Sequence, residues 1–244
     1  MPVFRLTRQL AFPDPELAED GLLAVGGDLS VGRLMLAYRH GIFPWYSEGE
    51  PILWWSPDPR MVIVPQRFHT SKRLLRVLKQ QKFRFTLDTV FADVIRGCAA
   101  VRRRHERGTW ITPDMIEAYV RLHEAGYAHS VEAWQEETLA GGLYGLSFGA
   151  CFFGESMFTR ATDASKAALT AFVHQCVRWD IQLIDCQLPN PHLRRLGALE
   201  MPRREYLRLL ESLAQRATLR GPWRFDEDLA ASAFRRQSDG LPPE

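Results

Sequence analysis

The sequence contains no long hydrophobic run. No apolar stretch approaches the roughly 18 residues that a membrane-spanning helix needs. The first residues, MPVFRLTRQLAF, lack the basic-then-apolar pattern of a secretory signal. These two absences argue against a membrane protein and against a secreted one, so we expect a cytoplasmic protein with no membrane partner.

Cysteine is scarce, and its spacing argues against two kinds of site. The cysteines form no C-x-x-C pair and stand among apolar residues: Cys98, Cys151, Cys176 and Cys186. Because the cytosol is reducing, we expect no structural disulfide. The histidines show no paired spacing either, so the sequence predicts no zinc site and no other metal site.

Two families of catalytic motif are also missing. No G-x-x-x-x-G-K-[ST] phosphate loop occurs, which argues against nucleotide hydrolysis. No G-x-S-x-G elbow occurs, which argues against a serine hydrolase. The glycines of residues 139–149 stand in strand context without a following helix, so they indicate close approach of backbones.

The composition is that of a well-packed globular protein. The chain has 244 residues, 46% of them hydrophobic and 25% charged, which fits one large domain or two unequal ones. The run SPDP at residues 56–59 favours extended backbone and stops a helix. We predict a small N-terminal α/β domain over residues 1–58, a larger domain over 59–235 and a flexible tail over 236–244.

Capping residues and hydrophobic periodicity predict an α+β fold. Capping residues precede three amphipathic stretches: Asp28 or Ser30, Thr70 or Ser71, and Thr112. Residues 128–158 contain three short apolar runs, the pattern of an antiparallel meander. A long helix over 164–179 and a short strand at 181–188 should follow, which predicts a mixed sheet covered by helices.

Positive charge is concentrated in one part of the chain. Residues 67–107 hold twelve Lys or Arg against three acidic residues, a local charge of +9 that leaves −7 elsewhere. Such a region is typical of a surface that binds nucleic acid phosphate, although a solvated helix face has the same composition. The candidate binding residues are Arg67, Lys72, Arg73, Arg76, Lys79, Lys82 and Arg84.

Asp185 and Gln187 form the most informative pair. They stand two apart on an expected strand, so alternation predicts that both side chains project into the same space. A buried carboxylate needs a cation or donors, so Asp185 belongs either to a structural network or to a site that binds an amine. Glu155 and Met157 repeat the spacing. Together these residues indicate an apolar pocket with acidic edges, next to rings such as Trp45 on which a base could stack.

Several longer sequence motifs resemble those of a known family. They are GLLAVGGDLS, GIFPW, PILWWSPDPR, GTWI, YGLSFGACFFGESMF, DASKAAL and IDCQ. Over about residues 4–210 the chain resembles the leucyl/phenylalanyl-tRNA–protein transferase family. The resemblance implies an enzyme that moves leucine or phenylalanine, and methionine less readily, from aminoacyl-tRNA to the N-terminal Arg or Lys of a protein, which marks that protein for bacterial degradation. We expect it to act as a monomer. It implies no cofactor, no metal and no ATP, and a larger domain similar to the GNAT N-acetyltransferase fold.

The resemblance also implies roles for individual residues. Asp185 and Gln187 of IDCQ match catalytic positions, and Glu155 of GESMF matches an acidic residue at the site. Trp45 and Trp110 match tryptophans that line the end carrying the terminal adenosine. The positions implied for the aminoacyl pocket are Leu143, Phe152, Leu169, Phe172 and Ile184. On this interpretation Asp185 attracts and orients the incoming amine, and Gln187 hydrogen-bonds to it and helps to move its proton.

Two departures and two alternatives accompany the resemblance. Leu143 stands where the family often has Met, and Arg195 where it commonly has Ser. An acetyl-CoA-dependent N-acetyltransferase would need [RQ]-x-x-G-x-[GA] before a helix, and the nearest string, at residues 194–199, fails at its last position. A tRNA-binding protein without catalysis would keep the basic region and dispense with Asp185 and Gln187.

Overall fold

A small sheet occupies the N-terminal part of the chain in the computed structural model, which describes residues 3–101, 109–227 and 229. Its strand order is β1-β2-β4-β3, with β1–β2 parallel and the other pairs antiparallel. The strands are β1 (Phe4–Leu6), β2 (Leu22–Gly26), β3 (Phe43–Pro44) and β4 (Leu53–Trp55). Helix α1 (Val31–Arg39) begins where Ser30 accepts a hydrogen bond from the Arg33 amide, as its capping position predicts.

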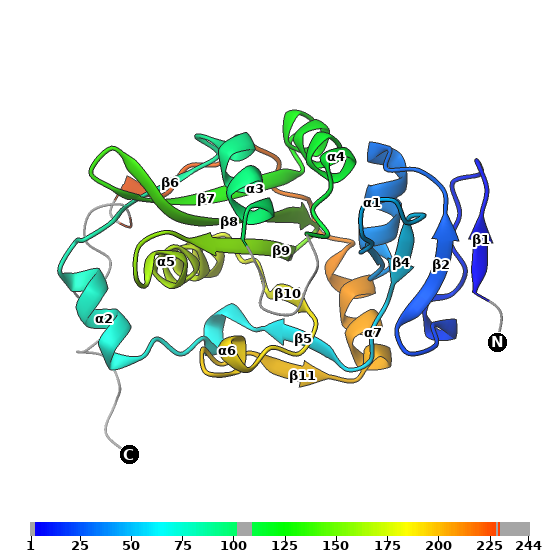
Figure 1. Ribbon diagram of the computed structural model, residues 1–244. Coiled ribbons are helices and arrows are strands. Elements are labelled where there is room, and N and C mark those ends of the chain that lie inside the picture. The colour runs from blue at the N-terminus through cyan, green and yellow to red at the C-terminus, as the bar shows by residue number, and fades with distance from the viewer. Residues whose placement is uncertain (1–2, 102–108, 228, 230–244) are drawn as a thin grey trace, which may run out of the picture.

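A seven-stranded mixed sheet forms the larger part of the molecule (Figure 1). Its order is β11-β5-β10-β9-β8-β7-β6, and β9–β10 is a parallel pair. The strands are β5 (Arg60–Ile63), β6 (Arg84–Leu87), β7 (Ala128–Gln135), β8 (Thr138–Phe148), β9 (Cys151–Thr159), β10 (Leu183–Gln187) and β11 (Leu199–Met201). Strands β7, β8 and β9 pair antiparallel in sequence order, which confirms the predicted meander. The α+β class with a mixed sheet is likewise confirmed.

Helices cover both faces of the large sheet. Figure 1 shows α3 and α4 on one face and α5 on the other. The helices after α1 are α2 (Lys72–Lys79), α3 (Phe91–Ala99), α4 (Pro113–Glu124), α5 (Ala164–Arg178), α6 (Pro191–Arg194) and α7 (Arg203–Leu213), with short 3-10 turns at Pro15–Leu17 and Pro65–Arg67. Ser71 and Thr112 cap α2 and α4 through their side chains, as expected. Among the described residues, no helix has the length and apolar character of a membrane span.

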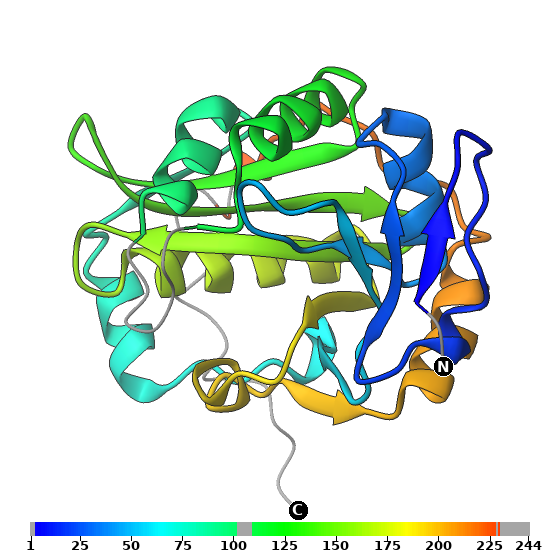
Figure 2. The same cartoon turned by 45° about the vertical axis from the view of Figure 1, so that its right-hand side comes forward.

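Two hydrophobic clusters lie on opposite faces of the large sheet. One cluster joins α3 and α4 to the small sheet and α1, so both sheets share a core. The other is built around α5 and the side chains of β8 and β9 that face it. Figure 2 shows the small sheet and α7 at one end of the molecule and α2 at the other. The expected tail, residues 236–244, lies outside the described residues.

Candidate active site

A cavity of about 600 Å³ opens where the small sheet meets β9 and β10. Most of the residues implied by the resemblance line it: Trp45, Trp110, Leu143, Phe152, Glu155, Leu169, Ile184 and Gln187. Phe172 lies behind the wall, where its ring packs edge-on against Phe152 with 4.5 Å between the ring centroids. The chain therefore brings together, from segments far apart in sequence, a mainly apolar chamber whose wall includes the polar side chains of Glu155 and Gln187.

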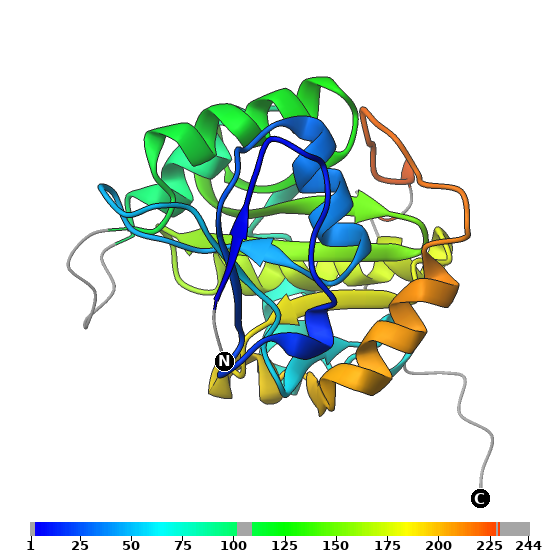
Figure 3. The same cartoon turned by 90° about the vertical axis from the view of Figure 1, so that its right-hand side faces the viewer.

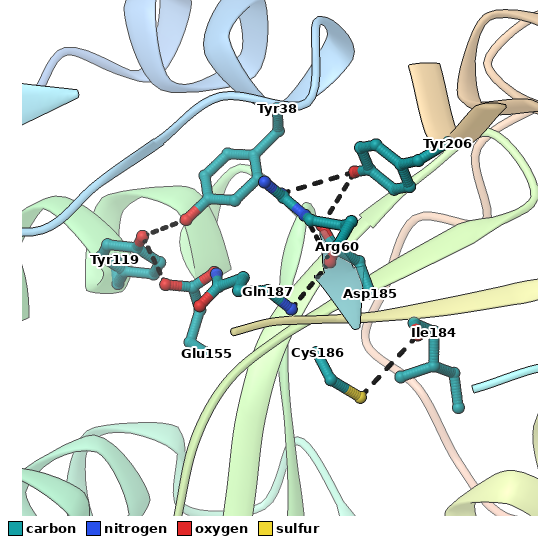
Figure 4. A network of polar contacts seen from close by, with 9 residues as sticks. All are labelled: Tyr38, Arg60, Tyr119, Glu155, Ile184, Asp185, Cys186, Gln187 and Tyr206. Carbon is teal, nitrogen blue, oxygen red and sulfur yellow. Dashed lines mark hydrogen bonds and ion pairs between the residues drawn. The ribbon is translucent and has the colours of Figure 1, made fainter. Parts of the chain in front are cut away.

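Glu155 is the carboxylate of this wall. It stands at an irregularity in β9, where the register against β8 shifts between Gly154 and Ser156. Its Oε2 accepts a hydrogen bond of 2.9 Å from the Tyr119 hydroxyl, and its Oε1 accepts one of 2.7 Å from Gln187 Nε2 (Figure 4). Tyr119 in turn shares a short hydrogen bond with the Tyr38 hydroxyl. Helices α1 and α4 thus hold Glu155 from the side of the small sheet.

Burial governs the charge of Glu155. It raises the pKa of this carboxyl to about 7, although the hydrogen bonds from Tyr38, Tyr119 and Gln187 favour the ionised form and Asp185 opposes it. Burial also raises the pKa of Tyr119 well above its ordinary value, and the neighbouring Glu155 adds to that effect. Near neutral pH the Tyr119 hydroxyl is therefore a donor, and Glu155 exchanges between its neutral and ionised forms.

A Glu155→Gln variant should gain stability relative to the unchanged protein as pH rises. The carboxyl pKa is higher in the folded state, about 7 against 4.5, so its favourable contribution is complete at acid pH and is lost as pH rises through 7. Between about pH 5 and about pH 8, the difference in unfolding free energy should move by roughly 2–3 kcal/mol in favour of the variant. Urea unfolding at both pH values measures this. Parallel pH profiles would contradict the assignment of the raised pKa to Glu155.

Gln187 reaches the cavity through an irregular end of β10. The register against β5 shifts between Asp185 and Gln187, and Gln187 has a left-handed φ of +64°. Its backbone N–H donates a 2.8 Å hydrogen bond to Asp185 Oδ1. That bond holds a backbone conformation that residues other than glycine rarely adopt. The side chain is thereby aimed at Glu155.

Asp185 is fully buried and belongs to a different set of contacts. Arg60 meets it with two hydrogen bonds, Nε to Oδ1 at 2.8 Å and Nη2 to Oδ2 at 2.6 Å. The Tyr206 hydroxyl donates to Oδ2 at 2.8 Å. Burial alone would lower the pKa of Arg60, but Asp185 raises it above its ordinary value, so Arg60 stays charged. Figure 4 shows this group beside the pair formed by Glu155 and Gln187.

This arrangement corrects one expectation from the sequence. Regular alternation places Asp185 and Gln187 in the same space, but of the two only Gln187 is among the described residues that line the cavity. The bulge and the left-handed φ of Gln187 break the alternation. Two alternatives were left open for Asp185, a structural network or an amine-binding site. Its contacts with Arg60 and Tyr206 are those of a structural network.

Four participants in these networks were missed by sequence reasoning. Tyr38 and Tyr119 fit the apolar faces of their helices and look like core residues there. Arg60 and Tyr206 come from β5 and α7, far from Asp185 in sequence. The only available signal was that a buried Asp requires a cation, which does not say which one.

The rim of the cavity carries tryptophan. The partly buried Trp45 packs edge-on against Trp55, with 5.5 Å between ring centroids, and its carbonyl accepts a 2.7 Å hydrogen bond from Trp55 Nε1. Trp110 is buried on the same lining. Arg195, which departs from the family pattern, is exposed and donates to the Pro191 carbonyl one turn back in α6. No structural reason for an Arg at that position emerges.

All seven candidate phosphate-binding residues are exposed. They lie on the 3-10 turn before α2, on α2 itself, at residue 82 and on β6. Arg73 pairs with Asp163 at 3.0 Å yet keeps 74% of its side chain exposed, and Arg84 lies over the Trp134 ring. The arginines at residues 102–104 and 107 lie outside the described residues. Within the described chain, His, Cys, Asp and Glu form no group of three or more suited to a metal ion.

Comparison with known proteins decides the family. The family model described as leucyl/phenylalanyl-tRNA protein transferase matches residues 62–211, and the model of its N-terminal domain matches residues 27–58. The chain belongs to the leucyl/phenylalanyl-tRNA–protein transferase family. The protein is therefore an aminoacyltransferase.

Curated relatives of the same name extend over nearly the whole chain. The transferase of Anaeromyxobacter sp. (strain Fw109-5) is 57% identical over 93% of this chain and 97% of its own length. That of Desulfatibacillum aliphaticivorans is 56% identical over 93% and 98%. That of Syntrophobacter fumaroxidans is 60% identical over 86% and 90%. Each carries the name leucyl/phenylalanyl-tRNA–protein transferase.

Two solved structures show a distant similarity. A functionally unknown conserved protein from Staphylococcus epidermidis matches with a TM-score of 0.39 and 8% identity, over 74% of this chain and 68% of its own. L-PGS from Bacillus licheniformis matches with a TM-score of 0.38 and 10% identity, over 69% and 54%. Scores of this size carry no argument about the fold, so the GNAT-like domain of this transferase family member stays a prediction.

Proposed function

We propose that this protein transfers leucine or phenylalanine, and methionine less readily, from aminoacyl-tRNA to the N-terminal Arg or Lys of acceptor proteins, which marks them for degradation. The observation that carries the proposal is the apolar cavity whose wall contains the hydrogen-bonded pair Glu155 and Gln187. An apolar chamber suits an unbranched or aromatic side chain, and polar groups at its wall suit an amine. The preference for an N-terminal Arg or Lys rests on the family resemblance.

The reaction that the site would catalyse is the aminolysis of an ester. The nitrogen of the acceptor amine bonds to the ester carbonyl carbon, the carbon–oxygen bond to the terminal ribose breaks, and the amine proton ends on the ribose hydroxyl. An α-amine has a pKa of about 7.7–8.0, so a useful neutral fraction exists at neutral pH and no strong base is needed. Alignment of amine and ester can supply roughly 7–11 kcal/mol of the barrier.

Gln187 is the residue that we assign to the attacking amine. Its Nε2 donates to Glu155, so the carbonyl oxygen of its amide is the acceptor that it offers to an amine N–H. Glu155 fixes that orientation, and as an anion it also attracts an ammonium group. Asp185 acts one step away, because its charge is paired with Arg60 and its Oδ1 holds the Gln187 backbone.

The cavity wall supplies selection for the transferred side chain. Leu143, Phe152 and Ile184 present apolar surface to it. Trp45 and Trp110 line the same cavity, and we assign them to the terminal adenosine because the resemblance implies that role. β-Branched side chains should be rejected by shape, although one methyl group is worth only about 1–3 kcal/mol. Discrimination should therefore be moderate.

The proposal also covers the division into domains and the oligomeric state. The SPDP run joins the last strand of the small sheet to the first strand of the large one, which supports a domain boundary near residue 58. We place the catalytic domain, with a GNAT-like fold, after this boundary, although the two sheets share one core cluster. We expect the protein to act as a monomer.

The exposed cations of α2 should bind tRNA phosphate. Replacing Arg76 and Lys79 together by alanine should weaken tRNA binding and reduce the slope of log Kd against log salt by about 1 for each lost phosphate contact. The matched control replaces the exposed Arg204 and Arg208 of α7, at the other end of the molecule (Figure 2). Filter binding from about 50 to about 200 mM salt measures both slopes. Equal slopes for the two double variants would remove α2 from the binding surface.

The function itself is tested by direct transfer. Purified protein is mixed with tRNA carrying radiolabelled leucine or phenylalanine and with a peptide that begins with Arg, without ATP or acetyl-CoA. Label should appear on the peptide, and a peptide that begins with Ala is the matched control. Retention of all label on tRNA, with tRNA still bound, would favour a binding protein without catalysis and refute the proposal.

A further inference from the structure

The chain after α7 returns to the large sheet as a strap, which we define as residues 216–227. It lies beyond the residues that the family model matches. Figure 3 shows it (orange to red) rising from α7 along the right-hand side of the view. The Thr218 hydroxyl accepts a 2.9 Å hydrogen bond from the Gly149 amide, and Arg220 donates to the Ala125 carbonyl at 2.6 Å. The strap is thus fixed to the turns that end β8 and α4.

A buried aspartate fastens the middle of the strap. Asp88 Oδ2 accepts hydrogen bonds from the Trp223 amide at 2.7 Å and from His129 Nδ1 at 2.8 Å. Its Oδ1 accepts another from the Ser130 amide at 2.9 Å. A Cβ at Gly221 would lie 2.6 Å from the His129 ring, so this approach requires glycine. These contacts determine where the Trp223 side chain enters the core.

Trp223 lies against the aromatic residues behind the cavity wall. Only 3% of it is exposed, and its ring stacks on His129 with 3.5 Å between centroids. The centroids of Phe172 and Phe152 lie 5.9 and 6.0 Å from that of Trp223. Phe152 lines the cavity, whereas Trp223 is not among the described lining residues. Trp223 therefore supports the wall from outside the chamber.

Phe152 is confined on its other side as well. A Cβ at Gly145 of β8 would lie 2.6 Å from the Phe152 ring, which shows how closely the ring lies on that strand. The ring is thus held between the backbone of β8 and the pair Phe172 and Trp223. It can retreat from the cavity only if one of those supports is removed.

We infer that Trp223 sets the depth of the aminoacyl pocket and thereby the preference between phenylalanine and leucine. The inference rests on the proposed function. Trp223 is a positioning residue, because it acts through Phe152 and does not touch the cavity. Removing the indole leaves space into which Phe152 can move, and the larger transferred side chain gains more from a deeper pocket than the smaller one.

The test compares kcat/KM for phenylalanyl-tRNA and leucyl-tRNA on the same enzyme preparations. In Trp223→Leu the ratio of phenylalanine to leucine should rise by about three- to tenfold, below the roughly 10–200-fold that one methylene makes by direct contact. Trp223→Phe should shift it less, in the same direction. The ratio is unaffected by a partly unfolded fraction, because both substrates meet the same active molecules.

Leu213→Ala is the matched control. Leu213 is equally buried, belongs to the C-terminal end of α7 and lies in the other hydrophobic cluster. Its replacement should lower stability and leave the ratio unchanged. An unchanged ratio in both Trp223 variants would overturn the inference, and Trp223→Phe decides the matter if Trp223→Leu does not fold. Absence of transfer by the unaltered protein would overturn the proposed function instead, and the inference with it.

Discussion

Gln187→Ala is expected to lower kcat/KM for aminoacyl transfer roughly a hundred- to ten-thousandfold while tRNA binding is retained. The variant removes the amide that donates the 2.7 Å hydrogen bond to Glu155 and whose carbonyl oxygen we assign to the amine. It also leaves the Glu155 carboxylate with one donor fewer in a buried position. Rates of label transfer at saturating acceptor, together with tRNA affinity, separate the catalytic loss from a binding loss.

The expected loss is large but incomplete. Placement of the ester by the cavity and by tRNA contacts does not depend on Gln187, and that placement supplies much of the rate. Gln182→Ala is the control, because the exposed side chain of Gln182, just before β10, donates only to Asp180 among its described contacts, and its backbone bond to Ala150 survives the substitution. Activity of Gln187→Ala close to that of the control would remove Gln187 from the mechanism.

Arg60→Met should destabilise the fold by roughly 3–5 kcal/mol, because it leaves the charge of Asp185 buried without its cation. Both side chains of this ion pair are completely inaccessible. Denaturant unfolding gives the free energy directly. Adding Asp185→Asn to Arg60→Met should recover a large part of the loss, since the pair is then removed as a unit.

Arg33→Met provides the comparison. Arg33 is as buried as Arg60, but the side chain of its partner Asp28 is 50% exposed and stays hydrated when the arginine is removed. Its cost should therefore be distinctly smaller than that of Arg60→Met. Equal losses for the two variants would mean that burial of the arginine, and not the stranded aspartate, determines the effect.

The helices and strands could be predicted because their signals are local. Ser30, Ser71 and Thr112 cap helices one residue before the first turn, and the sequence shows all three. The meander follows from alternating apolar runs over residues 128–158. Where signals were weaker the bounds moved: the short strand expected at residues 181–188 spans Leu183–Gln187.

The candidate site could be predicted from the sequence only in part. The family motifs identified the cavity lining, but the partners of its polar groups come from distant segments, as with Arg60 and Asp185. The bulge between Asp185 and Gln187 has no residue signature such as glycine, so the direction of Asp185 could not be derived from alternation. Trp223 stands in a stretch of weak periodicity, and only tertiary packing shows its neighbours.

The strap has a consequence for how such an enzyme can diverge. A pocket whose depth depends on a residue outside its lining can change preference without any substitution next to the reacting groups. Two homologues with the same cavity residues are then able to differ in the amino acid they handle best. A sequence comparison restricted to the residues that line the cavity would miss that difference, whereas a comparison of positions 221 and 223 would show it.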